Sequence, residues 1–163
     1  MKSSKSKLSS TRINRIRDQG YQNYSDQQIS ELAFGNRFAY QLCTTLLFVG
    51  VLLCNIPILG TIMAIAFLGV VLPNHPFDYI YNYFLAKRMN KPQLPPRSMQ
   101  LKFACSNATL LIGLTIYFAQ NNMMTIATIL GFSLVGVAVL VATIDLCIPS
   151  IIFNASIGKL LKD

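Results

Sequence analysis

Two long stretches of this 163-residue chain contain no charged side chain, and they constrain its fold more than any other feature. One stretch covers residues 38–72 and the other residues 103–144, which is 35 and 42 residues. A helix needs about 20 apolar residues to cross a bilayer, so each stretch is close to twice that length. Only 12% of the residues are charged, against about 25% in an ordinary soluble domain. The sequence therefore predicts an integral membrane protein.

The fourteen Lys and Arg residues predict how the chain is oriented in the membrane. Seven precede the first uncharged stretch, five lie between the two stretches, and two follow the second. If each stretch folds as a hairpin of two helices, all fourteen cations lie on one side, which the positive-inside rule makes cytoplasmic. We therefore expect a multi-pass protein with both termini in the cytoplasm. The net charge of +8 reflects this topology, and we expect the lipid bilayer as a partner and no nucleic acid.

The predicted fold class is an all-α membrane protein with four transmembrane helices, arranged as two tandem helical hairpins. A cytoplasmic interfacial helix is expected in addition. Residues 1–24 are rich in Ser, Lys and Arg and are expected to form a basic flexible cytoplasmic tail, followed by a four-helix transmembrane domain over residues 25–158. The four spanning helices are expected at about residues 38–55, 57–72, 103–119 and 123–143, and the interfacial helix at about residues 75–89.

Local patterns support these boundaries. Ser25 and Gln28 have the spacing of a capping box, which predicts a short helix from Asp26 to about Phe34. After Pro76, aromatic residues recur at helical spacing and are followed by Lys87 and Arg88, a pattern typical of a helix lying in the membrane interface.

The two halves of the chain also resemble each other. Arg37-Phe38-Ala39, at the start of the first uncharged stretch, is echoed by Lys102-Phe103-Ala104 at the start of the second. This similarity predicts a tandem duplication of a two-helix unit. Because both units would start on the same side of the membrane, they would be related by a pseudo-twofold axis along the membrane normal.

Three of the four cysteines are candidate catalytic thiols. Cys43, Cys105 and Cys147 all lie within about two turns of the cytoplasmic ends of their predicted helices. Three thiols at similar depth could form a redox or metal-responsive site, or could pack as small hydrophobic residues. The chain has no Cys-x-x-Cys pair, so neither a zinc site nor a thioredoxin motif is predicted. We expect no cofactor and no bound metal.

Acidic residues and the single histidine are candidates for interface or structural roles. His75 could titrate or pair with Asp78, and helix capping or interfacial hydrogen bonding is the simpler interpretation. Asp145 follows the fourth predicted helix and is expected at the membrane boundary. Its expected partner is Lys102 or Arg37.

Several motifs resemble the bacterial integral-membrane domain-of-unknown-function family 4395 (DUF4395), and together they extend over residues 31–155. They are Asn74-His75-Pro76-Phe77-Asp78-Tyr79-Ile80-Tyr81-Asn82, Leu94-Pro95-Pro96, Lys102-Phe103-Ala104 and Asp145-Leu146-Cys147. The resemblance implies a bacterial inner-membrane protein and no defined activity. Members of the family often end the fourth helix with Cys-x-x-Cys, whereas this chain has Cys147-Ile148-Pro149-Ser150. Such a sequence closes no disulfide of its own, but its one sulfur could form a mixed disulfide or a persulfide.

The chain contains no nucleotide-binding, hydrolase or metalloprotease motif, which weighs against an enzyme. The leading interpretation is a non-enzymatic accessory or interaction protein, with itself or a membrane or thiol-protein as partner. Small residues four apart in the fourth helix permit close packing, within the chain or in a homo-oligomer. The alternative is a cytoplasm-facing thiol or sulfur redox protein that uses Cys147, with Cys43 or Cys105 as resolving thiol. A small-solute carrier is the third interpretation, which fails if Asn107 faces lipid or bonds the backbone.

Overall fold

Helices make up all the regular secondary structure of residues 8–160, the part of the chain that the computed structural model describes. The predicted all-helical class is therefore confirmed. In chain order the elements are α1 (Ser10–Asp18), α2 (Asp26–Leu52), α3 (Ile56–Val71), α4 (Pro76–Ile80), the π-helical turn η1 (Tyr81–Leu85), α5 (Ala86–Arg88), α6 (Met99–Gln120), α7 (Met124–Ile144) and α8 (Ile148–Leu160).

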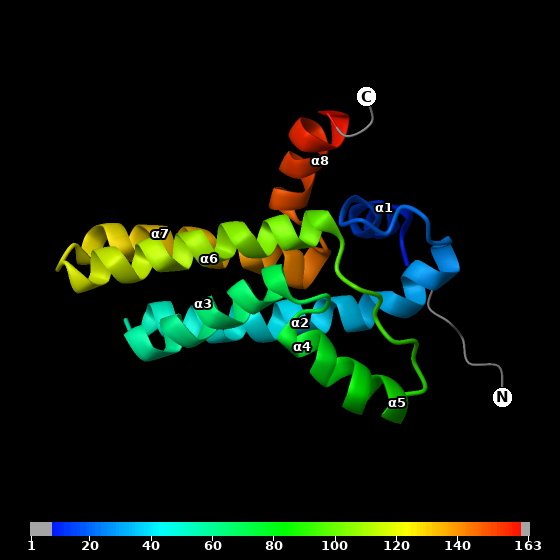
Figure 1. Cartoon of the computed structure of the whole chain (residues 1–163), viewed down its shortest axis with the longest axis horizontal. Helices are drawn as coiled ribbons and strands as arrows, with labels where there is room; N and C mark the ends of the chain where they lie inside the picture. The colour runs from blue at the N-terminus through cyan, green and yellow to red at the C-terminus, as the bar shows by residue number, and fades with distance from the viewer. Residues whose placement is uncertain (1–7, 161–163) are drawn as a thin grey trace.

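The four long helices α2, α3, α6 and α7 lie side by side along the long axis of the molecule, and α8 points away from them (Figure 1). Helix α2 packs against α3 and α7, and α6 packs against the same two helices. Each helix thus contacts its own hairpin partner and one helix of the other hairpin. A pseudo-twofold relation between the hairpins requires this order. The side chains buried between them include Leu47, Leu59, Ile62, Ile112 and Leu134.

Two of the described helices, α6 and α7, are each long and apolar enough to cross a membrane. A third span is obtained if α3 and the segment Pro76–Arg88, which meet at 79°, form one broken span. Helix α3 alone has 16 residues, and the first half of α2 is polar. The chain therefore has two to three candidate spans by length and composition.

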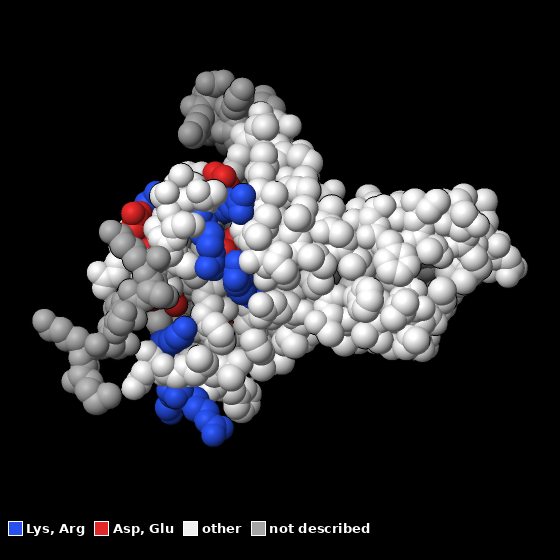
Figure 2. Space-filling model, turned by 180° about the vertical axis from the view of Figure 1, so that it is seen from behind, with Lys and Arg blue, Asp and Glu red and all other residues white. Residues whose placement is uncertain are grey.

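Charged side chains gather at one end of the molecule (Figure 2). This end holds α1, the start of α2 and α5, whereas the α2–α3 and α6–α7 turns at the opposite end contain no charged residue. Lys2, Lys5, Lys7 and Lys162 lie outside the described residues, and the side chain of Lys159 is not described either. The described cations thus agree with the one-sided placement that the sequence predicts.

The expectation of a flexible tail is wrong for Ser10–Asp18, which form α1. Ile13 and Ile16 on this helix are buried in a core cluster that also contains Ile29 and Leu101. Two isoleucines three residues apart face the same side of a helix. Among the surrounding charged residues, that apolar pair was too short a pattern to be recognised.

A single helix, α2, replaces the short helix and the separate first span that the sequence predicts. At its start, Ser25 Oγ accepts from the Gln28 N–H and the Gln28 side chain accepts from the Ser25 N–H, which completes a capping box. Gly35 directly follows Phe34, where the short helix was predicted to end. Instead it provides space for an aromatic ring, because a Cβ atom there would lie 2.5 Å from the Tyr81 ring.

The predicted interfacial helix consists of α4, η1 and α5. In Figure 1 this segment diverges from the four long helices. Its outer face exposes Tyr83 and Phe84, at 69% and 73%, and Lys87 and Arg88 are exposed beyond them. Tyr81 on the inner face is fully buried. Exposed aromatic rings next to cations are typical of a membrane interface.

Gly131 allows α7 to approach α2 closely. A Cβ atom at this position would lie 2.8 and 2.9 Å from the two methyl carbons of Val51, a buried residue with a stiff side chain. We expect Gly131→Ala to lower the free energy of unfolding by about 1–3 kcal/mol. Gly136→Ala, on the same helix with nothing within 4 Å, is expected to be neutral or to stabilise by about 0.5–1 kcal/mol. Equal melting temperatures of the two variants in detergent would contradict this prediction.

Candidate functional site

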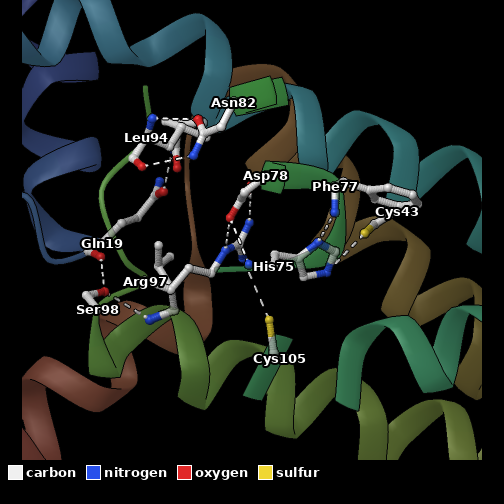
Figure 3. A network of polar contacts seen from close by, with 12 residues as sticks. Gln19, Cys43, His75, Phe77, Asp78, Asn82, Leu94, Arg97, Ser98 and Cys105 are labelled. Atoms are coloured by element: carbon white, nitrogen blue, oxygen red, sulfur yellow. Dashed lines mark hydrogen bonds and ion pairs between the residues drawn. The ribbon is translucent and has the colours of Figure 1, made fainter. Parts of the chain in front are cut away.

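Asp78 on α4 and Arg97, in the segment between α5 and α6, form a buried ion pair (Figure 3). Arg97 Nε donates to Asp78 Oδ2 at 2.6 Å, and Arg97 Nη2 donates to Asp78 Oδ1 at 3.1 Å. The two side chains are only 3% and 4% exposed. Because the pair is bidentate and enclosed, the Arg97 charge is neutralised where it lies.

Further hydrogen bonds join residues within the linker between the two hairpins, which covers residues 72–98. Asn82 Nδ2 donates to the Leu94 carbonyl at 3.1 Å, and the Leu94 N–H donates to Asn82 Oδ1 at 2.7 Å. The backbone N–H of Arg97 donates to the backbone carbonyl of Pro73 at 2.7 Å. These bonds hold Arg97 in place against Asp78.

His75 caps α4 and also approaches Cys43 on α2 (Figure 3). Its ring Nδ1 accepts from the backbone N–H of Phe77 at 3.3 Å. The backbone N–H of His75 donates to Asp78 Oδ2 at 3.2 Å. Because Nδ1 is an acceptor, the neutral ring carries its proton on Nε2. That atom lies 3.8 Å from Cys43 Sγ. His75 therefore presents a donor to the thiol and is no base for it.

Stability is expected to depend on pH through His75. Burial lowers the pKa of His75 to about 3, and the Arg97 charge acts in the same direction against the opposing effect of Asp78. Because the usual pKa is 6.5, the unfolded chain binds a proton between pH 6.5 and 3 that the folded protein does not. Stability is then complete above pH 6.5 and falls as the pH drops, by up to about 1.4 kcal/mol per pH unit.

The measurement is the apparent melting temperature in detergent between pH 7.5 and 4.5. His75→Asn is the matched variant, since Asn also caps helices and does not titrate. We expect its melting temperature to fall less steeply than that of the wild type. Parallel pH profiles for the two proteins would exclude His75 as the cause.

The three candidate thiols, Cys43, Cys105 and Cys147, line the same pocket. Cys105 Sγ accepts from Arg97 Nη1 at 3.7 Å, and Cys147 Sγ accepts from Ser150 Oγ at 3.1 Å. All four cysteines lie in the described part of the chain and are free thiols. Burial raises the pKa of Cys147 against the opposing hydrogen bonds from Ser150. This thiol is therefore protonated at neutral pH, which makes it a weak nucleophile.

The pocket has a volume of about 410 Å³ and lies between α2, α3, α6, α7 and the first turn of α8. Its walls are mainly Leu, Ile, Val and Ala side chains, while His75, Arg97 and the three thiols form a polar end. Two hydroxyls from pocket-lining residues, Tyr40 Oη and Thr44 Oγ1, are buried and have no hydrogen-bond partner among the described residues. Sequence reasoning missed Arg97, Tyr40 and Thr44, because their environment arises only on folding.

Asn107 also lines the pocket, and its side-chain amide donates to the Phe103 carbonyl at 2.9 Å. A bond to the backbone is the outcome that weighs against a solute carrier. In the described part of the chain, no group of three or more His, Cys, Asp or Glu side chains could hold a metal ion.

Asp145 lies outside the pocket and connects the α7–α8 junction to α1 and α2. The sequence pointed to Lys102 or Arg37 as its partner, and the structure pairs it with Arg37 and Arg12. Arg37 Nε and Nη2 donate to Oδ1 and Oδ2 at 2.7 and 2.8 Å, and Arg12 Nε donates to Oδ2 at 2.8 Å. The Asp145 side chain is 1% exposed. Arg12 was missed because it was assigned to the flexible tail.

In a comparison with protein families, residues 35–157 match a domain of unknown function (DUF4395). The resemblance noted in the sequence is thereby confirmed. No curated protein and no solved structure matches the chain. The matched region contains the pocket, the Asp78–Arg97 pair and Asp145, whereas α1 with Arg12 lies outside it.

Proposed function

This chain belongs to the DUF4395 family, and we propose that it is a non-enzymatic membrane protein that binds an apolar, membrane-soluble molecule. The single observation that carries this proposal is the pocket of about 410 Å³ between the long helices. Ligand sites are typically concave, mostly apolar and about 300–1,000 Å³ in volume, with a few polar groups that orient the ligand. Protein interiors are otherwise close-packed, so a pocket of this size favours an occupant.

The proposal includes four spanning helices, α2, α3, α6 and α7, in a bacterial inner membrane with both termini in the cytoplasm. The one-sided charge distribution supports this orientation. The 16 residues of α3 correspond to about 24 Å of helix, which is short for a hydrocarbon core of about 30 Å. A short span is accommodated by local thinning of the bilayer.

The test uses the full-length protein in liposomes and a decylphenyl diazirine photolabel, with adducts located by mass spectrometry. A lipid-facing residue is labelled in proportion to the label concentration, whereas a residue in a binding pocket is labelled saturably and is protected by excess decylbenzene. We expect saturable labelling of pocket residues on α2, α6 and α7.

Blocking variants make this test specific. Ala108→Phe on α6 and Ala138→Phe on α7 introduce a ring at residues that line the pocket from two walls. Ala64→Phe introduces the same ring at an exposed position of α3. We expect the first two to abolish saturable labelling and the third to leave it unchanged. Labelling without saturation in the wild-type protein would overturn the proposal.

A second candidate function is thiol or sulfur redox chemistry, favoured by the position of three thiols around one pocket. It is tested with a membrane-impermeant maleimide on sealed inside-out vesicles, with and without prior reduction. Labelling of Cys147 that increases after reduction would support a redox role. Thiols that react only after the protein is unfolded would identify all three as packing residues.

A further inference from the structure

We infer that the segment Pro76–Arg88, which we call the arm, binds the headgroups of anionic phospholipids through Lys87 and Arg88. The arm comprises α4, η1 and α5 and contributes no residue to the pocket. The inference rests on the membrane arrangement proposed above, but it does not depend on whether the pocket holds a ligand. It goes beyond a place in the membrane interface by stating the lipid class and the two side chains that select it.

The direction of the arm places it along the surface of the bilayer. The arm meets α3 at an angle of 79°, and in Figure 1 it diverges from the group of long helices. Because α3 is proposed to cross the membrane, a segment nearly perpendicular to it runs nearly parallel to the membrane plane. An amphipathic helix in this position buries its apolar side chains at the acyl boundary and keeps its cations among the headgroups.

Contacts on the inner face determine which side of the arm points outward. The Tyr81 ring is fully buried, and its centre lies 6.2 Å from that of Phe34 and 6.1 Å from that of Phe38, both on α2. Asn82 also exchanges two hydrogen bonds with Leu94 in the following part of the linker. These contacts prevent the arm from turning its outer face toward the protein.

The outer face of the arm is apolar and aromatic. Tyr83 and Phe84 are the most exposed residues on it, and Ile80 and the adjacent Met89 are exposed as well. A contiguous exposed apolar patch marks an interaction site with a protein or a membrane. Aromatic rings next to Lys and Arg are enriched at the membrane–water interface. This face is therefore suited to insertion at the level of the headgroups.

The two cations at the end of the arm have no counter-charge within the described part of the chain. The side chains of Lys87 and Arg88 are exposed and form no hydrogen bond or ion pair there. The other described arginines each donate to an oxygen atom of the protein: Arg12, Arg15, Arg17, Arg37 and Arg97. The only acidic residue of the linker is Asp78, which already pairs with Arg97. An anionic headgroup would supply the missing negative charge.

The bilayer surface fits this face better than a protein does. Protein–protein interfaces are depleted in lysine, whereas the polar side of membrane-surface helices is rich in Lys and Arg. A second copy of the chain would bring the same cations together, and like charges repel. In an anionic leaflet, apolar acyl chains lie directly beneath negatively charged headgroups, which matches the combination of rings and cations on the arm.

The test uses a tryptophan reporter, because the chain has no tryptophan of its own. Phe84→Trp places an indole on the outer face of the arm in the full-length protein. The protein is reconstituted into nanodiscs of phosphatidylcholine and phosphatidylglycerol, and one of the two lipids carries bromine atoms near the glycerol end of its acyl chains. Brominated chains quench a neighbouring indole. Brominating each lipid in turn therefore gives the preference of the arm for the anionic lipid.

We expect both brominated lipids to quench the indole, with phosphatidylglycerol preferred about 3- to 10-fold. A cation near an anionic surface contributes roughly a fivefold preference, so Lys87→Gln and Arg88→Gln should each lower the preference about 2- to 5-fold. Arg88→Lys should retain most of it, and high salt should reduce it. Arg17→Gln is the matched control, because it removes a charge from the same end of the molecule that Asp26 already neutralises.

A second reporter measures the lipid outside the proposed site. Phe132→Trp places an indole at an exposed position of α7, within the uncharged stretch of residues 103–144, and should show no preference. Equal quenching by both lipids at the arm would overturn the headgroup site, as would a preference that Arg17→Gln lowers as much as Arg88→Gln does. An arm indole that neither lipid quenches would overturn the inference as a whole, since water or a protein would then cover this face. Saturable labelling of the pocket would be unaffected by either result.

Discussion

Replacing Asp78 with alanine is expected to lower the free energy of unfolding by about 3–5 kcal/mol, because it leaves the Arg97 guanidinium buried without its counter-charge. Both side chains are almost fully enclosed, so water cannot take over the role of the carboxylate. At about 2–4 °C per kcal/mol for a chain of this size, the apparent melting temperature in detergent should fall by roughly 10 °C. The measurement is thermal unfolding of the purified variant at neutral pH.

Asp26→Ala is the matched control for this prediction. Asp26 also pairs with an arginine, Arg17, but their side chains are 59% and 36% exposed. An exposed pair contributes about 0–1 kcal/mol. The double variant Asp78→Leu/Arg97→Met removes both buried charges and should recover most of the stability that Asp78→Ala loses. Equal losses for Asp78→Ala and Asp26→Ala would contradict the prediction.

Asp145→Ala is expected to cost about 3 kcal/mol, for two separate reasons. The carboxylate accepts three hydrogen bonds from Arg12 and Arg37, and such bonds to charged groups contribute about 1.5–3 kcal/mol each without being additive. The backbone of Asp145 is also left-handed, with φ of 59°. This conformation costs alanine about 1–2 kcal/mol and is tolerated better by Asp, Asn and Gly.

Two further substitutions separate these causes. Asp145→Gly removes the same side chain but relieves the backbone strain, and Asp145→Asn keeps a tolerated backbone but loses the charge. Both are expected to melt between the wild type and Asp145→Ala. Trypsin cleavage within α1 should become faster in all three variants, because the Arg12 contact holds that helix. An unchanged cleavage rate would refute the role of Asp145 in holding α1.

The long helices α3, α6 and α7 could be predicted close to their observed bounds, and the start of α2 as well, because these boundaries depend on local signals. The uncharged stretches, the prolines after α3 and the capping box before α2 each act within a few residues. Helix α1 could not be predicted in the same way. Its burial depends on partners such as Leu101 and Asp145, which lie far away in the chain.

The candidate site shows the same limit. Cys43, Cys105 and Cys147 were grouped from their expected depths, and they do line one pocket. Arg97 was counted only as a loop cation, because nothing near it in the sequence shows that it becomes buried against Asp78. Thr44 resembles Thr45 in sequence, and only the fold distinguishes the residue that lines the pocket from the one whose hydroxyl bonds its own helix.

The hydrogen bonds within the linker also affect the order in which the parts of the protein can fold during synthesis. Asp78, Asn82, Leu94 and Arg97 find their partners within the segment that starts at Pro73. The ribosome therefore completes all of these partners before it translates α6. The first hairpin and its linker can neutralise their buried charge while the nascent chain is still being translated. The second hairpin then joins a half whose costliest polar groups are already paired.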